Sequence, residues 1–131
     1  MRIFLSFAGR NDLLSLNPDG GAILNICGEL KPDKAYLFYN INSKESDSDY
    51  FAAASQTKPA LEKLSIDMRS KIKDSESNKS IPNPEYGKPT LECEIIKILC
   101  DDPTDYDIIY PQMNHELENI IESNGLDHEY Y

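Results

Sequence analysis

The residues best suited to bind an anionic ligand form a short polar loop directly after the first apolar run of the chain. The apolar run covers residues 2–8, and Gly9, Arg10, Asn11 and Asp12 follow it. A glycine lets a ligand approach the backbone, a guanidinium can form two parallel hydrogen bonds with a phosphate, and Asn or Asp can bond a ribose or a base. This loop therefore predicts recognition of a small phosphate-bearing molecule. An ordinary polar turn with an exposed arginine is the alternative.

Three further positions extend this candidate site. Gly20 and Gly21 precede the next helix and either expose backbone N–H groups to an anion or serve only a turn and a helix cap. Asn40 ends the second apolar run and either reads a base edge or forms a turn. With the polar residue inside the first run, the predicted ligand-binding set is Ser6, Gly9, Arg10, Asn11, Asp12, Gly20, Gly21 and Asn40.

Catalytic and metal chemistry have weaker sequence signals. The chain lacks GxGxxG and GxxxxGK[ST], which disfavours dinucleotide and P-loop chemistry. His115 and His128 have no Ser or Cys partner in a recognisable arrangement, so we predict no catalytic residue. The four aspartates between residues 101 and 107 fit no calcium loop and favour a solvated turn. Three unpaired cysteines argue against a zinc site or disulfides, so no metal and no cofactor is predicted.

Composition limits the partners of the chain. Its 131 residues hold 23 acidic and 13 basic side chains, which gives a formal net charge of −10. A duplex-binding surface needs clustered Lys and Arg, so binding of duplex nucleic acid is disfavoured, whereas a small anion remains compatible with backbone donors. No apolar stretch approaches the roughly 18 residues of a membrane span. We expect a soluble cytoplasmic protein with no membrane partner.

Positioning the candidate residues requires alternating strands and helices. Apolar runs predict strands over 2–8, 34–41 and 89–99, and helical spacing predicts a helix over 22–30. A second helix is expected from about residue 50 to about 73, either kinked at Pro59 or divided near Lys58. A short turn over 106–109 should precede a last helix that starts near Pro111 and ends at Asn124-Gly125.

The order β-α-β-α-β-α predicts an α/β fold, a Rossmann-like three-layer sandwich with a mainly parallel sheet. Residues 74–88 are polar and predict a surface excursion, because too little chain follows for a second domain. A fourth strand would be due where the sequence stops at Tyr130-Tyr131. We therefore expect residues 1–131 to form a single Rossmann-like domain that is incomplete at its C-terminus.

The motifs resemble those of a known family. The stretch 3–12, then Gly21-Ala-Ile-Leu24, then 34–40, resembles the start of CRISPR-associated Rossmann-fold (CARF) domains, especially those of sigma-54-type RNA-repair regulators and CRISPR ancillary effectors. Their pattern is a first strand, a Gly-x-x-Asp loop often continuing to Pro, a Gly-x-Ile-Leu helix and a strand with a polar end. Leu13 stands here in place of the Pro. Residues 102–106 and the helix after them are similar to the third αβ unit of that family.

The resemblance implies a function that the residues alone do not give. It implies a regulatory domain that binds a cyclic oligoadenylate or another RNA-derived nucleotide at a homodimer interface and signals to an effector module absent from this chain. The implied pocket residues are Ser6, the loop Gly9–Asp12 and Asn40. Two alternatives stay open: an acidic protein-interaction module with no small-molecule ligand, and a phosphodiesterase or ring nuclease.

Overall fold

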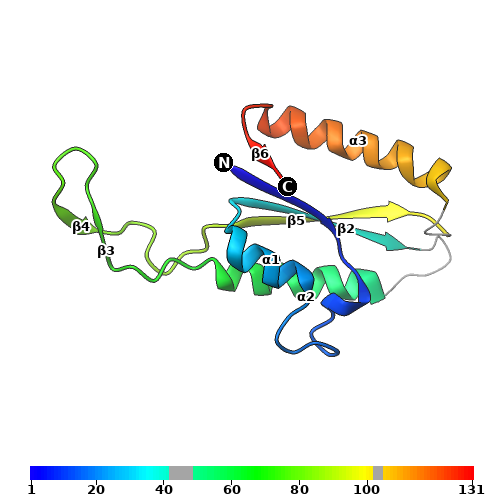
Figure 1. Ribbon diagram of the computed structural model, residues 1–131, viewed down its shortest axis with the longest axis horizontal. Coiled ribbons are helices and arrows are strands. Elements are labelled where there is room, and N and C mark those ends of the chain that lie inside the picture. The colour runs from blue at the N-terminus through cyan, green and yellow to red at the C-terminus, as the bar shows by residue number, and fades with distance from the viewer. Residues whose placement is uncertain (42–48, 102–104) are drawn as a thin grey trace.

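The computed structural model describes residues 1–41, 49–101 and 105–131 (Figure 1). Asp102 of the predicted acidic turn lies outside the described residues. Four strands form one all-parallel sheet in the order β5-β2-β1-β6. Their bounds are Arg2–Phe7 for β1, Lys34–Ile41 for β2, Glu92–Leu99 for β5 and Glu129–Tyr130 for β6. The predicted α/β fold with a parallel sheet is confirmed.

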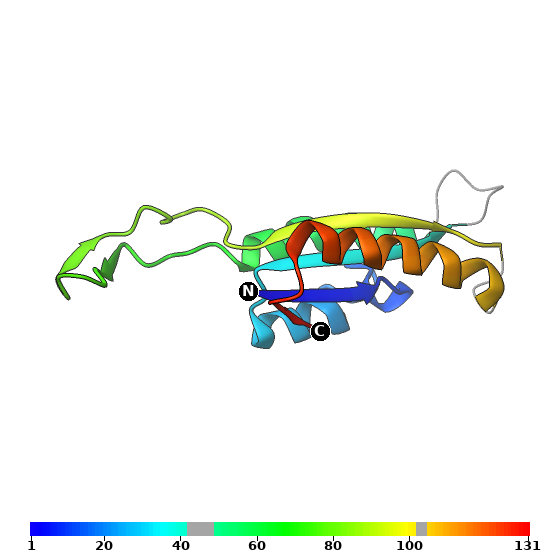
Figure 2. The same ribbon diagram turned by 90° about the horizontal axis from the view of Figure 1, so that it is seen from above.

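Three helices cover the two faces of this sheet. α1 (Ala22–Leu30) and α2 (Asp49–Leu64) lie on one face, and α3 (Tyr106–Asn124) runs along the other (Figures 1 and 2). β2 is central, and its residues from Ala35 to Tyr39 are all buried because layers cover both of its sides. This double burial explains the unbroken apolar run, since no position of such a strand faces water.

The fourth strand is present in a short form. The sequence predicted that it would be missing, but Glu129 and Tyr130 pair in parallel with Arg2 and Ile3 of β1. The pairing continues to Leu5, whose N–H donates to the carbonyl of Tyr131 at 2.8 Å. The last residues of β1 extend beyond this contact toward the carboxyl edge of the sheet.

Two helices differ from their predicted bounds. α3 starts at Tyr106 as one continuous helix that contains Pro111, so the predicted separate turn is wrong; Gly125 ends α3 as predicted, with φ of 90°. α2 contains Pro59 but ends at Leu64, well before the predicted end near residue 73. The helix stops because Ser65 turns toward Thr90, whose N–H and hydroxyl both donate to the carbonyl of Ser65.

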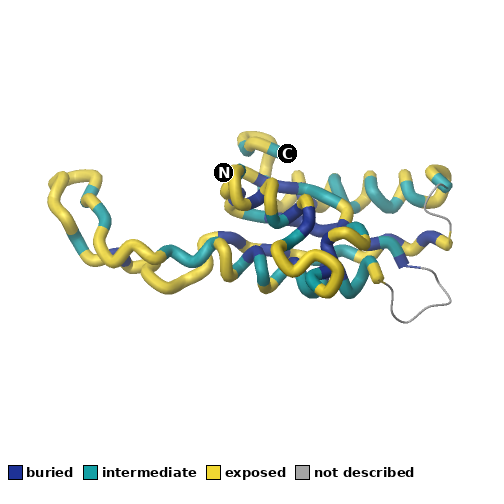
Figure 3. The backbone as a smooth tube through the Cα atoms, turned by 60° about the horizontal axis from the view of Figure 1, so that its bottom comes forward, coloured by how far each residue is buried: buried dark blue, intermediate teal, exposed yellow. Residues whose placement is uncertain are grey.

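Residues 65–91, which we call the arm, project from the body of the domain (Figure 3). The predicted surface excursion therefore exists and is longer than the expected 74–88. The arm contains a two-stranded antiparallel hairpin, β3 (Lys71–Lys73) and β4 (Ser80–Pro82).

In the part of the chain that the structure describes, no helix has both the length and the apolar character needed to cross a bilayer.

Candidate ligand-binding site

The topology selects one edge of the sheet as the candidate site. From β1 the chain passes through α1 to β2 and then to β5 on one side, whereas α3 returns it to β6 on the other side of β1. In open α/β sheets, ligands bind outside the carboxyl ends of the strands at the point where the strand order reverses. Here that point is the end of β1, from which the loop Gly9–Asp12 emerges. We call this edge the rim.

A buried carboxylate organises the rim loop. Arg10–Asp12 form one turn of 3-10 helix, and Asp12 is only 7% exposed. Its Oδ2 accepts the N–H of Gly9 at 2.9 Å, and its Oδ1 accepts the N–H of Ile23 at 3.3 Å. Ile23 is the second residue of α1, so Asp12 satisfies a free donor of that helix from outside it. The carboxylate thus ties the loop to the start of α1.

Gly21 makes this contact possible because it lies against the loop. A Cβ atom at Gly21 would be 2.4 Å from the carbonyl oxygen of Asn11 and 2.6 Å from Oδ1 of Asp12. Gly20 has a φ of +94°, and its N–H donates to the carbonyl of Asn17 at 2.9 Å, as in a tight turn. Because the negative charge of Asp12 already occupies the N-terminus of α1, the geometry favours the turn-and-cap role of both glycines over an anion site.

Arg10 is the cationic side chain of the rim loop. It is exposed, and its Nε lies 3.2 Å from a carboxylate oxygen of Asp49, the first residue of α2. Both side chains are more than half exposed, so water screens this ion pair and it adds little to stability. The guanidinium is therefore held near the rim by a partner that a phosphate could replace.

The other predicted residues divide between the two faces of the sheet. Ser6 is half-buried on the α1–α2 face, because it lies two residues from each of the core residues Phe4 and Ala8 and so shares their face of the sheet. Asn40 is half-buried on the α3 face, where Phe38 also lies. One small ligand on one face of the sheet would thus reach only one of Ser6 and Asn40. The structure brings Gly9, Arg10, Asn11 and Asp12 together with Gly20 and Gly21.

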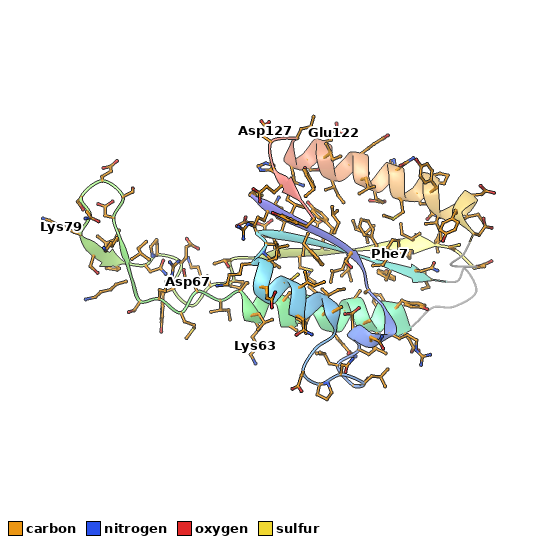
Figure 4. All side chains as sticks on the ribbon, in the orientation of Figure 1. Phe7, Lys63, Asp67, Lys79, Glu122 and Asp127 are labelled. Carbon is orange, nitrogen blue, oxygen red and sulfur yellow. The ribbon has the colours of Figure 1, made fainter. Side chains whose placement is uncertain are left out.

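Phe7 is a rim residue that sequence reasoning missed. It ends β1 on the α3 face and is 45% exposed, with its ring centroid 5.6 Å from that of Phe38 (Figure 4). An exposed aromatic ring beside a cationic loop can stack on a nucleobase. In the sequence Phe7 belongs to an apolar run that predicts burial, so its exposure is apparent only in the structure.

Two cavities lie at the opposite, amino edge of the sheet. One of about 380 Å³ is lined by Cys27, Leu61 and Arg69, among others, and a more open one of about 450 Å³ lies near Arg2. The Arg69 guanidinium donates two hydrogen bonds to Asp67, at 3.0 and 2.8 Å, and these hold the pKa of that carboxyl well below its usual range. This guanidinium is thus already paired with a carboxylate, so it is not free to bind an anion in the first cavity.

The rim residues that the structure describes offer groups for binding, namely the exposed Arg10 guanidinium and the exposed Phe7 ring. Among the described residues, no group of three or more His, Cys, Asp or Glu could hold a metal ion. His115 lies on α3, where its ring hydrogen-bonds with Asn119. Burial raises the pKa of the Cys27 thiol to about 11, so this group is not an activated nucleophile.

Comparison of the chain with protein families, characterised proteins and solved structures finds no match. The resemblance of its motifs to CARF domains therefore remains a prediction. The function has to be inferred from the geometry of the rim.

Proposed function

We propose that this chain is a ligand-sensing domain that binds a cyclic oligoadenylate or another RNA-derived nucleotide at the rim and passes the signal to an effector module. One observation carries the proposal: the loop Gly9–Asp12, with its exposed arginine, leaves the strand at which the sheet order reverses. This is the position at which folds of this kind bind nucleotides. The resemblance of the motifs to CARF domains supports the nature of the ligand.

Two side chains would provide most of the recognition. Arg10 would exchange the carboxylate of Asp49 for a phosphate, which a guanidinium binds through two parallel hydrogen bonds. Phe7 would stack on an adenine ring on the α3 face, where Asn40 also lies. Asp12 would keep the loop in shape without touching the ligand, because both of its oxygens are already bonded to the backbone.

The rim also offers a route from the ligand to the helices. Arg10 bridges the loop to the first residue of α2, and Asp12 bridges the same loop to α1. A phosphate that replaces Asp49 would free the carboxylate at the start of α2, while the bonds of Asp12 keep the loop attached to α1. A ligand shifts a conformational equilibrium by its differential affinity for the two states. A homodimer would transmit this shift to an effector.

Isothermal titration with linear and cyclic tri-, tetra- and hexa-adenylates tests the proposal. Saturable binding is expected, and Arg10→Ala should weaken it by more than about 1.5 kcal/mol, roughly tenfold in Kd, because a charge-assisted bond is lost. Phe7→Ala should weaken binding by about 1–3 kcal/mol through lost stacking. Arg69→Ala is the matched control: it removes an exposed arginine on the arm and should leave the affinity unchanged.

Three results would count against this function. A folded protein that binds none of these nucleotides contradicts it, and so does binding that Arg10→Ala leaves unaltered. If chromatography shows that the bound nucleotide is cleaved, the result would instead favour the phosphodiesterase or ring-nuclease alternative. A protein-interaction module is a second candidate, favoured by one observation, the projecting arm.

A further inference from the structure

The arm differs in charge from the rest of the chain. Residues 65–91 hold five basic and four acidic side chains, whereas the other residues hold eight basic and nineteen acidic ones. The arm thus carries a net charge of +1 against −11 elsewhere. None of the ion pairs within the described residues involves its four lysines, which are all exposed: Lys71, Lys73, Lys79 and Lys88. These lysines, the arm lysines, are available to an acidic partner.

The arm is ordered by its own polar contacts instead of by a hydrophobic core. Asn83, its one buried polar side chain among those described, donates to the carbonyl of Arg69 at 2.8 Å and accepts the N–H of Glu85 at 3.0 Å. Large apolar side chains stay in water, with Met68 70% exposed and Tyr86 50% exposed. A preformed surface with exposed Met and Tyr is typical of the centre of a protein interface.

A surface of complementary character lies at the C-terminal end of α3. Residues 106–131 contain six acidic side chains and no Lys or Arg. Glu118, Ile121 and Glu122 share one exposed side of the helix, because they are spaced i, i+3 and i+4. Leu126, which is 79% exposed, and Asp127 continue this surface beyond the helix. We call these five residues the acidic face.

We propose that the arm docks on the acidic face of a second copy of this chain. Each copy carries both surfaces, so a two-fold dimer would form the contact twice. Within one chain the arm leads away from α3: Lys79 lies at its far end, whereas Glu122 and Asp127 lie near the body (Figures 1 and 4).

The contact deepens the proposed function, which invokes a homodimer, but charge reversal tests it without any nucleotide, so its failure can be distinguished from a failure of nucleotide binding. Light scattering coupled to gel filtration should give the mass of a dimer for the natural chain. A triple substitution on either surface should give a monomer, because each contact then faces like charge. The arm variant carries Lys71→Glu, Lys73→Glu and Lys79→Glu, and the face variant carries Glu118→Lys, Glu122→Lys and Asp127→Lys.

The two monomeric variants should recover association when they are mixed. The acidic arm of the arm variant then meets the basic face of the face variant. The natural basic arm of the face variant meets the natural acidic face of the arm variant, so both contacts of the two-fold dimer are restored. A chain that carries all six substitutions should dimerise with itself. The matched control reverses three exposed lysines outside the arm and should stay dimeric: Lys31→Glu, Lys63→Glu and Lys97→Glu.

Several results would overturn the proposal. A natural chain that is monomeric up to roughly 100 µM lacks even a micromolar interface. If both triple variants remain dimeric, the dimer uses another surface. If the two variants are folded by circular dichroism but do not associate when mixed, the copies do not meet through these charges. A monomer whose arm lysines bind single-stranded RNA would assign the arm to nucleic acid instead.

Discussion

Replacing Asp12 with alanine removes one buried carboxylate and the two backbone hydrogen bonds that it accepts. The bond from the Gly9 N–H has the ordinary length of 2.9 Å, and the bond from the Ile23 N–H is longer, at 3.3 Å. A buried N–H left without a partner costs about 1–3 kcal/mol, and loss of a helix cap costs about 1 kcal/mol. Because the bond from Ile23 is long, its loss is expected to cost an amount near the lower end of this range. We therefore expect the free energy of unfolding to fall by about 2–4 kcal/mol in total.

Urea denaturation followed by circular dichroism measures this loss against a total stability of about 5–15 kcal/mol for a domain of this kind. Asp12→Asn keeps one amide oxygen as an acceptor but loses the charge, so a smaller loss of about 1 kcal/mol is expected. Asp19→Ala is the matched control, because Asp19 is an exposed aspartate in the turn just before α1. Its substitution should change stability by less than about 0.5 kcal/mol.

A loss below about 1 kcal/mol for Asp12→Ala, or one equal to that of Asp19→Ala, would refute the capping role. A stable Asp12→Ala protein that had lost only nucleotide affinity would return Asp12 to the ligand. The two roles therefore separate on one variant, because unfolding reports the first and titration reports the second.

Gly21→Ala should lower the free energy of unfolding by about 1–3 kcal/mol through overpacking. Gly28 has open space around it within α1, so Gly28→Ala should raise the free energy of unfolding by about 0.5–1 kcal/mol. Equal effects of the two substitutions in urea denaturation would contradict the close approach at Gly21. Burial raises the pKa of the Cys93 thiol to about 12, so at about pH 8 it should react with a disulfide reagent far more slowly in the folded chain than in urea, and similar rates would argue against its burial. Since hydrogen bonds from Arg69 lower the pKa of Asp67, the favourable pairing is present above the ordinary Asp pKa and is lost as the pH falls through the lowered pKa. Arg69→Ala should therefore raise the pKa of Asp67 toward its usual range in an NMR titration. An unchanged pKa would mean that the pair is not formed in solution.

The strands and the first helix were predictable because their environment repeats along the chain. β2 has the predicted bounds, since a strand covered on both sides is apolar at nearly every position. α1 also has its predicted bounds, with Ile23 and Cys27 on its buried side at helical spacing. Local pattern and tertiary environment agree in these elements, so the sequence alone suffices.

The rest depends on contacts between distant residues. Ile66, Met68 and Ile72 continue a helical spacing beyond Leu64, but the hydrogen bonds between Ser65 and Thr90 direct the chain into the arm instead. β6 has only two residues and no pattern of its own. At the rim, the order of strand, loop and helix predicted only that the loop Gly9–Asp12 follows β1 at the carboxyl edge of the sheet. The role of Asp12 was not predictable, because it follows from the approach of Gly21 to Asn11.

The joined base of the arm has a consequence for how sequences of this kind can vary. Because Thr90 bonds directly to Ser65, the two ends of the arm meet, and we expect the sheet to keep its geometry when the chain between them changes in length. Closing a longer loop adds only about 0.6 kcal/mol for each doubling of its length. Residues 66–89 are thus a replaceable insertion, which could be exchanged for a tight turn or a foreign domain while the body folds unchanged. Natural relatives are expected to differ in length here before they differ anywhere in the sheet.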